Sequence, residues 1–154
     1  MNIEYSNDNK VLIRATEVEG YFEVPETVER IESYAFDGCE NLTAIVIPAS
    51  VCYIGPKIFN NCMNLGNLFC NIENLTALQY SPDAFDACEI EYCQLHVPTG
   101  LKDVYEEHPL FSQCMSVDEK NPEEVSSEVY KLVQKADEAF ENGDFEGAVI
   151  KYTI

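Results

Sequence analysis

The chain repeats itself at short range, and this repetition constrains the fold more than any other feature. Phe36 is followed 23 residues later by Phe59, and Cys39 is followed at the same distance by Cys62. A third, looser copy around Phe85 follows after 26 residues. Periods of 20 to 50 residues are typical of stacked supersecondary units, because one such unit cannot bury its apolar face alone. The sequence therefore predicts a stack of repeats.

Each repeat combines a short strand with a returning segment. In "LTAIVIP", Leu42, Ile45 and Ile47 occupy the apolar positions of an L-x-x-L-x-L pattern, which forms a strand with one face inward. Neighbouring copies place apolar residues at the same positions: Phe22 and Val24, then Leu65, Leu68 and Cys70, then Leu95 and Val97. Between these strands, "VERIESYAFDGC" and "VCYIGPKIFNNC" carry a second apolar set. We therefore expect four rungs of a stacked parallel sheet, with the chain returning on the far side.

The repeated segment "IPASVCYIGPKIFNNCMNLGNL" resembles the BspA-like branch of leucine-rich repeats, whose units read I-P-x-x-V-x-x-I-x-x-x-A-F-x-x-C-x-x-L. The resemblance covers about residues 12–114, from an opening half-repeat in "DNKVLIRATEVEGYFEVPETV" to a closing strand and short helix in "LHVPTGLKDVYEEHPLF". The third unit departs from the pattern, because "CNIENLTALQYSPDAF" lacks the V-x-x-I spacing. The resemblance implies a solenoid used for protein or cell-surface recognition rather than catalysis. Members of this family are commonly surface-exposed bacterial proteins.

The sequence changes character after Cys114, where it becomes acidic and carries turn-forming residues. Asn121 followed by Pro122 marks a helix start, and apolar residues keep helical spacing until Asn142 and Gly143. The stretch "ADEAFENGDFEGAVIKY" resembles the core of a tetratricopeptide repeat, which implies a second helix after this glycine.

These patterns predict an α/β repeat protein in two parts. Residues 1–116 would form the BspA-like leucine-rich-repeat solenoid with its closing cap, and residues 117–154 a linker and a truncated tetratricopeptide-like α-helical hairpin. Because one helical repeat cannot bury its own faces, we expect the protein to continue beyond Ile154. The same exposed faces make self-association through the C-terminal helices an open alternative, and the oligomeric state stays undetermined.

The chain is acidic, with 28 acidic against 9 basic residues and a net charge of −19. Such a field repels phosphate backbones and anionic headgroups, so nucleic acid and membrane surfaces are poor candidate partners. No apolar run approaches the ~20 residues that a membrane helix needs. The start "MNIEYSNDNKVLI" has neither a basic nor an apolar signal region. We therefore expect a cytoplasmic location, or a cell-surface or secreted one if a leader has been removed.

Cysteine and histidine are the residues that invite a catalytic or metal-binding interpretation. Cys93 and His96 lie three apart in a predicted strand and therefore point to opposite faces, whereas a zinc site needs four converging donors. A thiol nucleophile needs a nearby base and electropositive surroundings, and this acidic sequence predicts neither. We expect no catalytic residue, no metal and no cofactor. A cysteine- or metal-dependent enzyme on the repeat scaffold is the alternative.

Three of the seven cysteines share one column of the repeat: Cys39, Cys62 and Cys88. Three stacked residues cannot all pair, and free cysteine is among the most buried residue types. We expect these thiols to be free and to fill the core. The equivalent phenylalanines predict an aromatic ladder beside them.

The strand positions between the inward residues predict a binding surface. Alternation along the strand turns one residue per rung outward, and Tyr21 flanks this row. The predicted contact residues are Tyr21, Glu23, Val46, Phe69 and His96. Apolar residues with polar neighbours are typical of recognition surfaces, although single exposed apolar residues are common on any protein. We therefore expect a non-catalytic module that presents this sheet face to a protein partner, whose identity the sequence does not specify.

Overall fold

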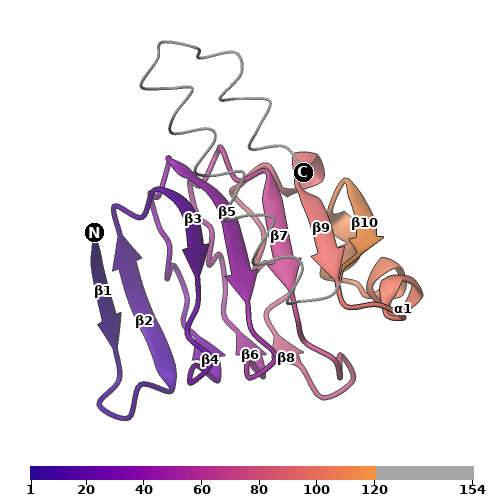
Figure 1. Cartoon of the computed structure of the whole chain (residues 1–154). Helices are drawn as coiled ribbons and strands as arrows, with labels where there is room; N and C mark the ends of the chain where they lie inside the picture. Colours follow the sequence, from indigo (N-terminus) through magenta and orange to yellow (C-terminus); the bar gives the residue numbers. More distant parts are fainter. Residues whose placement is uncertain (121–154) are drawn as a thin grey trace.

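The computed structural model describes residues 1–120, which form two five-stranded sheets on either side of one core (Figure 1). Sheet 1 has the order β1-β2-β4-β6-β8, and sheet 2 has the order β10-β9-β7-β5-β3. The strands of sheet 1 are β1 (Asn2–Tyr5), β2 (Val11–Thr16), β4 (Arg30–Ile31), β6 (Tyr53–Ile54) and β8 (Gln79–Tyr80). Those of sheet 2 are β3 (Gly20–Glu23), β5 (Leu42–Ile47), β7 (Asn67–Cys70), β9 (Gln94–Val97) and β10 (Ser116–Glu119).

The strand register reproduces the sequence period. In the parallel pair β5 and β7, Ile45 lies opposite Leu68 and Val46 opposite Phe69, each pair 23 residues apart. The shorter strands β4 and β6 of sheet 1 pair at the same spacing. Equivalent residues of successive repeats therefore stack directly over one another, which confirms the predicted stacked parallel sheet.

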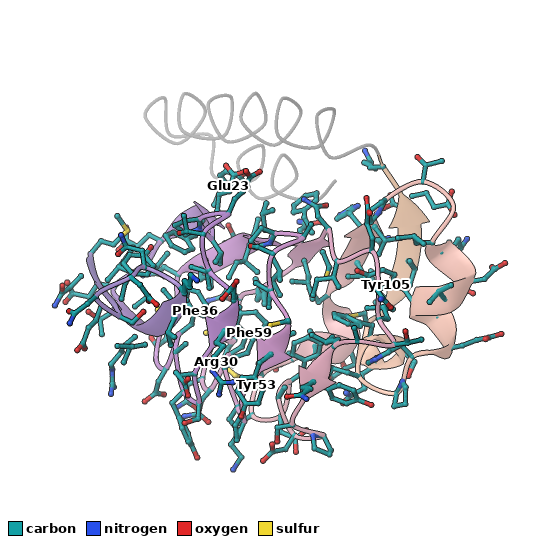
Figure 2. All side chains as sticks on the ribbon, turned by 90° about the horizontal axis from the view of Figure 1, so that it is seen from below. Glu23, Arg30, Phe36, Tyr53, Phe59 and Tyr105 are labelled. Atoms are coloured by element: carbon teal, nitrogen blue, oxygen red, sulfur yellow. The ribbon has the colours of Figure 1, made fainter. Side chains whose placement is uncertain are left out.

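The predicted aromatic ladder runs through the core between the two sheets. The Phe36, Phe59 and Phe85 rings are fully or almost fully buried, with neighbouring centroids 5.8 and 5.7 Å apart. Figure 2 shows Phe36 and Phe59 lying side by side within the solenoid. The ladder also extends at both ends to rings outside this repeat column, because Phe22 packs on Phe36 and Phe111 on Phe85.

The cysteine column lies at the turn beside this ladder. Gly38, Asn61 and Ala87 precede the three cysteines and adopt positive φ angles of 75°, 61° and 62°. The Cys62 thiol donates a hydrogen bond to the Phe36 carbonyl in the previous coil, at 3.0 Å. The prediction of free, core-filling thiols is confirmed for Cys39 and Cys62, which are buried, while Cys88 is half-buried.

The two ends of the stack are closed by elements without a repeat signature. At the N-terminal end, β1 and β2 form an antiparallel pair at the edge of sheet 1. At the other end, helix α1 (Lys102–Glu107) follows β9, as the family resemblance implied. The buried Tyr105 hydroxyl donates to the Ile72 carbonyl at 2.5 Å. Short 3-10 helices at Ile90–Tyr92 and Phe111–Gln113 complete the connections.

Strand β10 extends sheet 2 past the boundary expected at residue 116. It pairs in parallel with β9 over residues 116–119, so three residues assigned to the linker belong to the sheet. The predicted tetratricopeptide-like hairpin lies outside the described residues. Within residues 1–120, no helix is long and apolar enough to cross a membrane.

Candidate interaction surface

The two faces of sheet 2 belong to different apolar clusters. Along β5, Ile45 and Ile47 join the main core, while Ala44 and Val46 point the other way and cluster with Phe69 of β7. We call the second side the outer face of sheet 2. The alternation follows from the two-residue period of a strand. The predicted orientation of Val46 and Phe69 away from the main core is therefore confirmed.

The predicted solvent exposure of this face is wrong for most of its residues. Val46 is 4% exposed, and Phe69 and His96 are each 1% exposed. Tyr21 is half-buried, and Glu23 is the predicted contact residue that stands in solvent. Strand alternation predicts which way a side chain points, but not what lies against it. Parallel sheets are usually covered on both faces, so exposure cannot be assumed from strand alternation.

His96 connects three strands of the outer face. Its Nδ1 lies 2.5 Å from the Asp118 carboxylate on β10, and its Nε2 lies 3.0 Å from the Asn67 side-chain oxygen on β7. A protonated imidazole can donate to both oxygens. The ring also stacks on Phe69, with centroids 4.4 Å apart and planes 16° apart. The aromatic pair at the centre of the face is therefore held by polar contacts on both sides.

Sequence reasoning missed the role of Asp118, because it placed this residue in a linker. Asp118 lies directly opposite His96 in the parallel register of β9 and β10. The 22-residue separation of the two residues is close to the repeat period, and this spacing is the signal that could have identified β10 as another rung. The strand lacks the apolar L-x-x-L-x-L pattern, which explains why it was overlooked.

The buried thiols are poorly suited to nucleophilic chemistry. Burial raises the pKa of the Cys62 thiol to about 12 and that of Cys70 to about 11. The pKa of Cys93 is raised for the same reason. These side chains therefore stay protonated at neutral pH. Because the thiolate is the reactive form of cysteine, they are poor nucleophiles. Within residues 1–120, no group of three or more histidine, cysteine or acidic residues is arranged to hold a metal ion.

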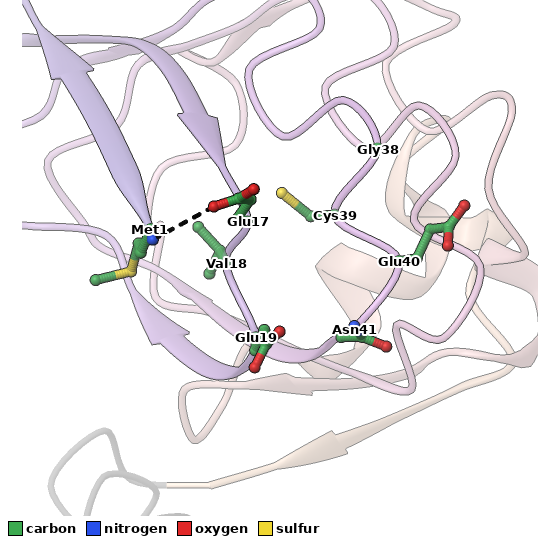
Figure 3. A pocket seen from close by; sticks show the side chains of 8 residues that line it. All are labelled: Met1, Glu17, Val18, Glu19, Gly38, Cys39, Glu40 and Asn41. Atoms are coloured by element: carbon green, nitrogen blue, oxygen red, sulfur yellow. Dashed lines mark ion pairs between the residues drawn. The ribbon is translucent and has the colours of Figure 1, made fainter.

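An open hollow lies at the N-terminal end of the stack, and Figure 3 shows the side chains that line it. Glu17, Glu19 and Glu40 line it together with Cys39, and the Met1 amino group lies 3.8 Å from the Glu17 carboxylate. Burial raises the pKa of the Cys39 thiol, and the negative charge of Asp37 adds to this increase. The hollow therefore does not supply an activated nucleophile.

Comparison with known proteins gives one family and one solved structure. Among curated proteins, none matches the chain. A solved structure of a leucine-rich cell surface protein from Faecalibacterium prausnitzii A2-165 is similar at 19% identity and a TM-score of 0.40. The similarity covers 77% of this chain and 38% of that one.

The family comparison is more extensive. The BspA type leucine-rich repeat region, in six copies, matches residues 17–142. The match extends into the segment that resembled a tetratricopeptide repeat, and no comparison supports that second resemblance. The repeat match spans most of the chain and agrees with the parallel stacking of its strands. The protein therefore belongs to the BspA-type leucine-rich repeat family.

Proposed function

We propose that this protein is a non-catalytic protein-interaction module whose contact surface is the outer face of sheet 2. The contact residues are Tyr21, Glu23, Val46, Phe69 and His96. The observation that carries the proposal is the apolar cluster of Val46 and Phe69, which is separate from the main core. The main core is sufficient to stabilise the fold. A second apolar cluster on the opposite side of the sheet is therefore expected to pack against another layer.

The composition of this face suits a protein partner. Interfaces combine buried aromatic anchors with a polar rim that excludes water. Phe69 and the stacked His96 supply the aromatic centre, while Glu23 and the partly exposed Asp118 carboxylate supply the rim. Such a face fits an apolar helix or strand of another protein.

The alternative of a cysteine- or metal-dependent enzyme has less support. The buried thiols have raised pKa values, and leucine-rich repeat proteins of this family act as recognition scaffolds. The similar solved structure is a cell surface protein. The comparisons give no support to the cytoplasmic location that the sequence led us to expect.

The test compares substitutions on the two sheets. Full-length protein, its Val46→Glu variant and its Tyr53→Glu variant would each be used to capture proteins from the source cells, followed by cross-linking and mass spectrometry. Tyr53 lies on sheet 1, so its substitution is the matched control. We expect Val46→Glu to lose a partner that Tyr53→Glu retains, with circular dichroism showing that both variants fold. Equal capture by all three proteins would contradict the proposal.

A further inference from the structure

We propose that Cys93 and Cys114 are an oxidisable pair, and that a disulfide oxidant cross-links them and thereby ties β10 to β9. Both thiols are free in this structure, and neither belongs to the repeat column of cysteines. The cross-link does not depend on the partner surface proposed above, because it lies in the part of the molecule that closes the stack.

The backbone brings the two cysteines together just before β9 and β10 begin. The Met115 N–H donates to the Cys93 carbonyl at 2.9 Å. In a parallel ladder, the residue that precedes such a donor lies opposite the acceptor, and here that residue is Cys114. The register shifts by one residue after this pair, since Gln94 lies opposite Ser116. Neighbouring strands are ~4.8 Å apart, which lies within the range of about 4.4–6.8 Å that a disulfide requires between its Cα atoms.

The side chains of the pair lie on the same side of sheet 2. Cys93 is fully buried in the main core, and Cys114 is partly buried and packs against that core. Burial raises the pKa of Cys93, and a thiolate at Cys114 raises it further, as expected for two sulfur atoms close together. Formation of the bond therefore requires rotation of the two side chains and no rearrangement of the sheet.

Two other cysteines are less suitable partners for Cys114. Burial raises the pKa of Cys114 to about 12, and Cys70 and Cys88 lie close enough to raise it as well. Cys70 lies on β7, which β9 separates from β10, so two strand spacings of ~4.8 Å place its backbone beyond the range of a disulfide. The Cys88 thiol donates to the Phe85 carbonyl at 3.1 Å, within its own turn. The pair that faces across β9 and β10 is therefore favoured.

An oxidant reaches the pair from the surface through Cys114. This residue lines an open hollow between α1 and β10, together with Lys102 and Ser116. The Cys114 thiol loses its proton to water and attacks one sulfur of the oxidant, which releases one thiolate and leaves a mixed disulfide. The Cys93 thiol loses its own proton and attacks the Cys114 Sγ, and the second thiolate leaves. Two cysteine thiols are thus oxidised, while the disulfide of the oxidant is reduced to two thiols that take up the two protons.

Burial makes this bond a structural one. A thiol with a high pKa is a poor leaving group, so the bond resists reduction once it has formed. Because β10 is the edge strand of sheet 2, the cross-link holds its first residues in place, and with them the approach of Asp118 to His96. Disulfides persist in oxidising compartments, whereas the cytosol keeps thiols reduced. The state of the pair in the source cells therefore follows the compartment in which the protein works.

The test treats the full-length protein with oxidised glutathione. Remaining thiols are alkylated under denaturing conditions, and the chain is cleaved after glutamate, which places Cys88, Cys93 and Cys114 on different peptides. We expect mass spectrometry of the monomer to find the Cys93 and Cys114 peptides linked, two hydrogen atoms lighter than their sum. Cys52 is exposed, so a glutathione adduct there shows that the oxidant is active.

Oxidation should also raise the urea midpoint and slow hydrogen exchange in β10 severalfold. Cys114→Ala should abolish both effects, while Cys52→Ala, the matched control, keeps them. The peptide map of the unsubstituted protein decides the question even if Cys114→Ala does not fold. An adduct on Cys52 with Cys93 and Cys114 both still free would overturn the proposal. A bond from Cys114 to Cys70 or Cys88, or a bond between two chains, would overturn it as well.

Discussion

The inner and outer faces of sheet 2 are built from alternating residues of the same strands, yet they differ in how they use the repeat. On the inner face, Ile45 and its equivalents Phe22, Leu68 and Leu95 are all hydrophobic. On the outer face, the matching row reads Glu23, Val46, Phe69, His96 and Asp118. The inner face repeats because every coil must fill the same space in the core. The outer face varies from coil to coil, and this variation is one reason why we propose it as the recognition surface.

The largest expected effect lies on the inner side. Phe59 packs between Phe36 and Phe85, so Phe59→Ala should lower the free energy of unfolding by about 3–5 kcal/mol. Urea unfolding followed by circular dichroism measures this loss, with Tyr92→Ala at a 67% exposed position as the control. A midpoint close to that of the unsubstituted protein would show that the aromatic ladder is not the centre of the core.

The same truncation on the outer face tests how far the two sides differ. Phe69 is buried and stacks on His96, but its apolar cluster is small. Phe69→Ala should therefore cost about 2–3 kcal/mol, at or below the low end for a core aromatic residue. The sequence analysis placed the Phe69 ring in solvent, and truncation of an exposed ring would cause almost no loss of stability. Thermal unfolding of this variant beside Phe59→Ala decides between an open and a covered outer face.

The raised pKa values of the buried thiols predict that the protein loses stability at alkaline pH. The ordinary thiol pKa is 9.0, and burial raises the pKa of Cys62 to about 12 and that of Cys70 to about 11. Above pH 9 the unfolded chain releases protons that the folded chain keeps, so stability is complete below this pH and falls as pH rises toward the folded values. Each buried thiol contributes a loss of about 1.4 kcal/mol per pH unit in this window.

Unfolding midpoints between pH 8 and about pH 11, the range that brackets the ordinary and raised thiol values, measure this slope. Cys62→Ala should reduce the slope, after allowance for its own loss of packing. Cys52 is exposed, so Cys52→Ala is the matched control. Equal slopes for the two variants would show that Cys62 is not protected by burial.

The smallest expected effect concerns the turn that precedes each cysteine. Ala87 adopts a φ of 62°, and the equivalent positions of the two preceding coils are Asn61 and Gly38. A left-handed backbone is strained for alanine, so Ala87→Gly should stabilise the fold by about 0.5–1 kcal/mol. The reciprocal Gly38→Ala should destabilise it by about 1 kcal/mol through backbone strain alone, because an added Cβ would meet no atom within 4 Å. Denaturant midpoints of the two variants should therefore move in opposite directions.

The repeat made much of the fold predictable from the sequence. The spacing of Phe36 and Phe59 predicted both the strand register and the aromatic ladder, because equivalent residues of a stacked coil must face one another. The closing helix followed from the family resemblance. The β1–β2 pair and β10 were not predicted, because terminal elements cover the ends of the stack and need not carry the repeat pattern.

The candidate site was predicted only in part. Strand alternation placed Val46, Phe69 and His96 on one face, and the structure confirms that they share it. The contact of His96 with Asp118 depends on a strand that the apolar pattern does not reveal. The choice of these residues as partner contacts stays a prediction.

The sequence by itself determined the repeat length, the inward residues and therefore the stacked parallel sheet. The spacing of apolar residues can be measured along the chain without knowing which residues lie against one another in space. Only the tertiary structure decided that the outer face is buried and that Asp118 reaches His96. Burial depends on what lies against a side chain, and this neighbour can come from any distance along the chain. Alternation along a strand predicts the face on which each side chain lies, but not which residues pack against that face.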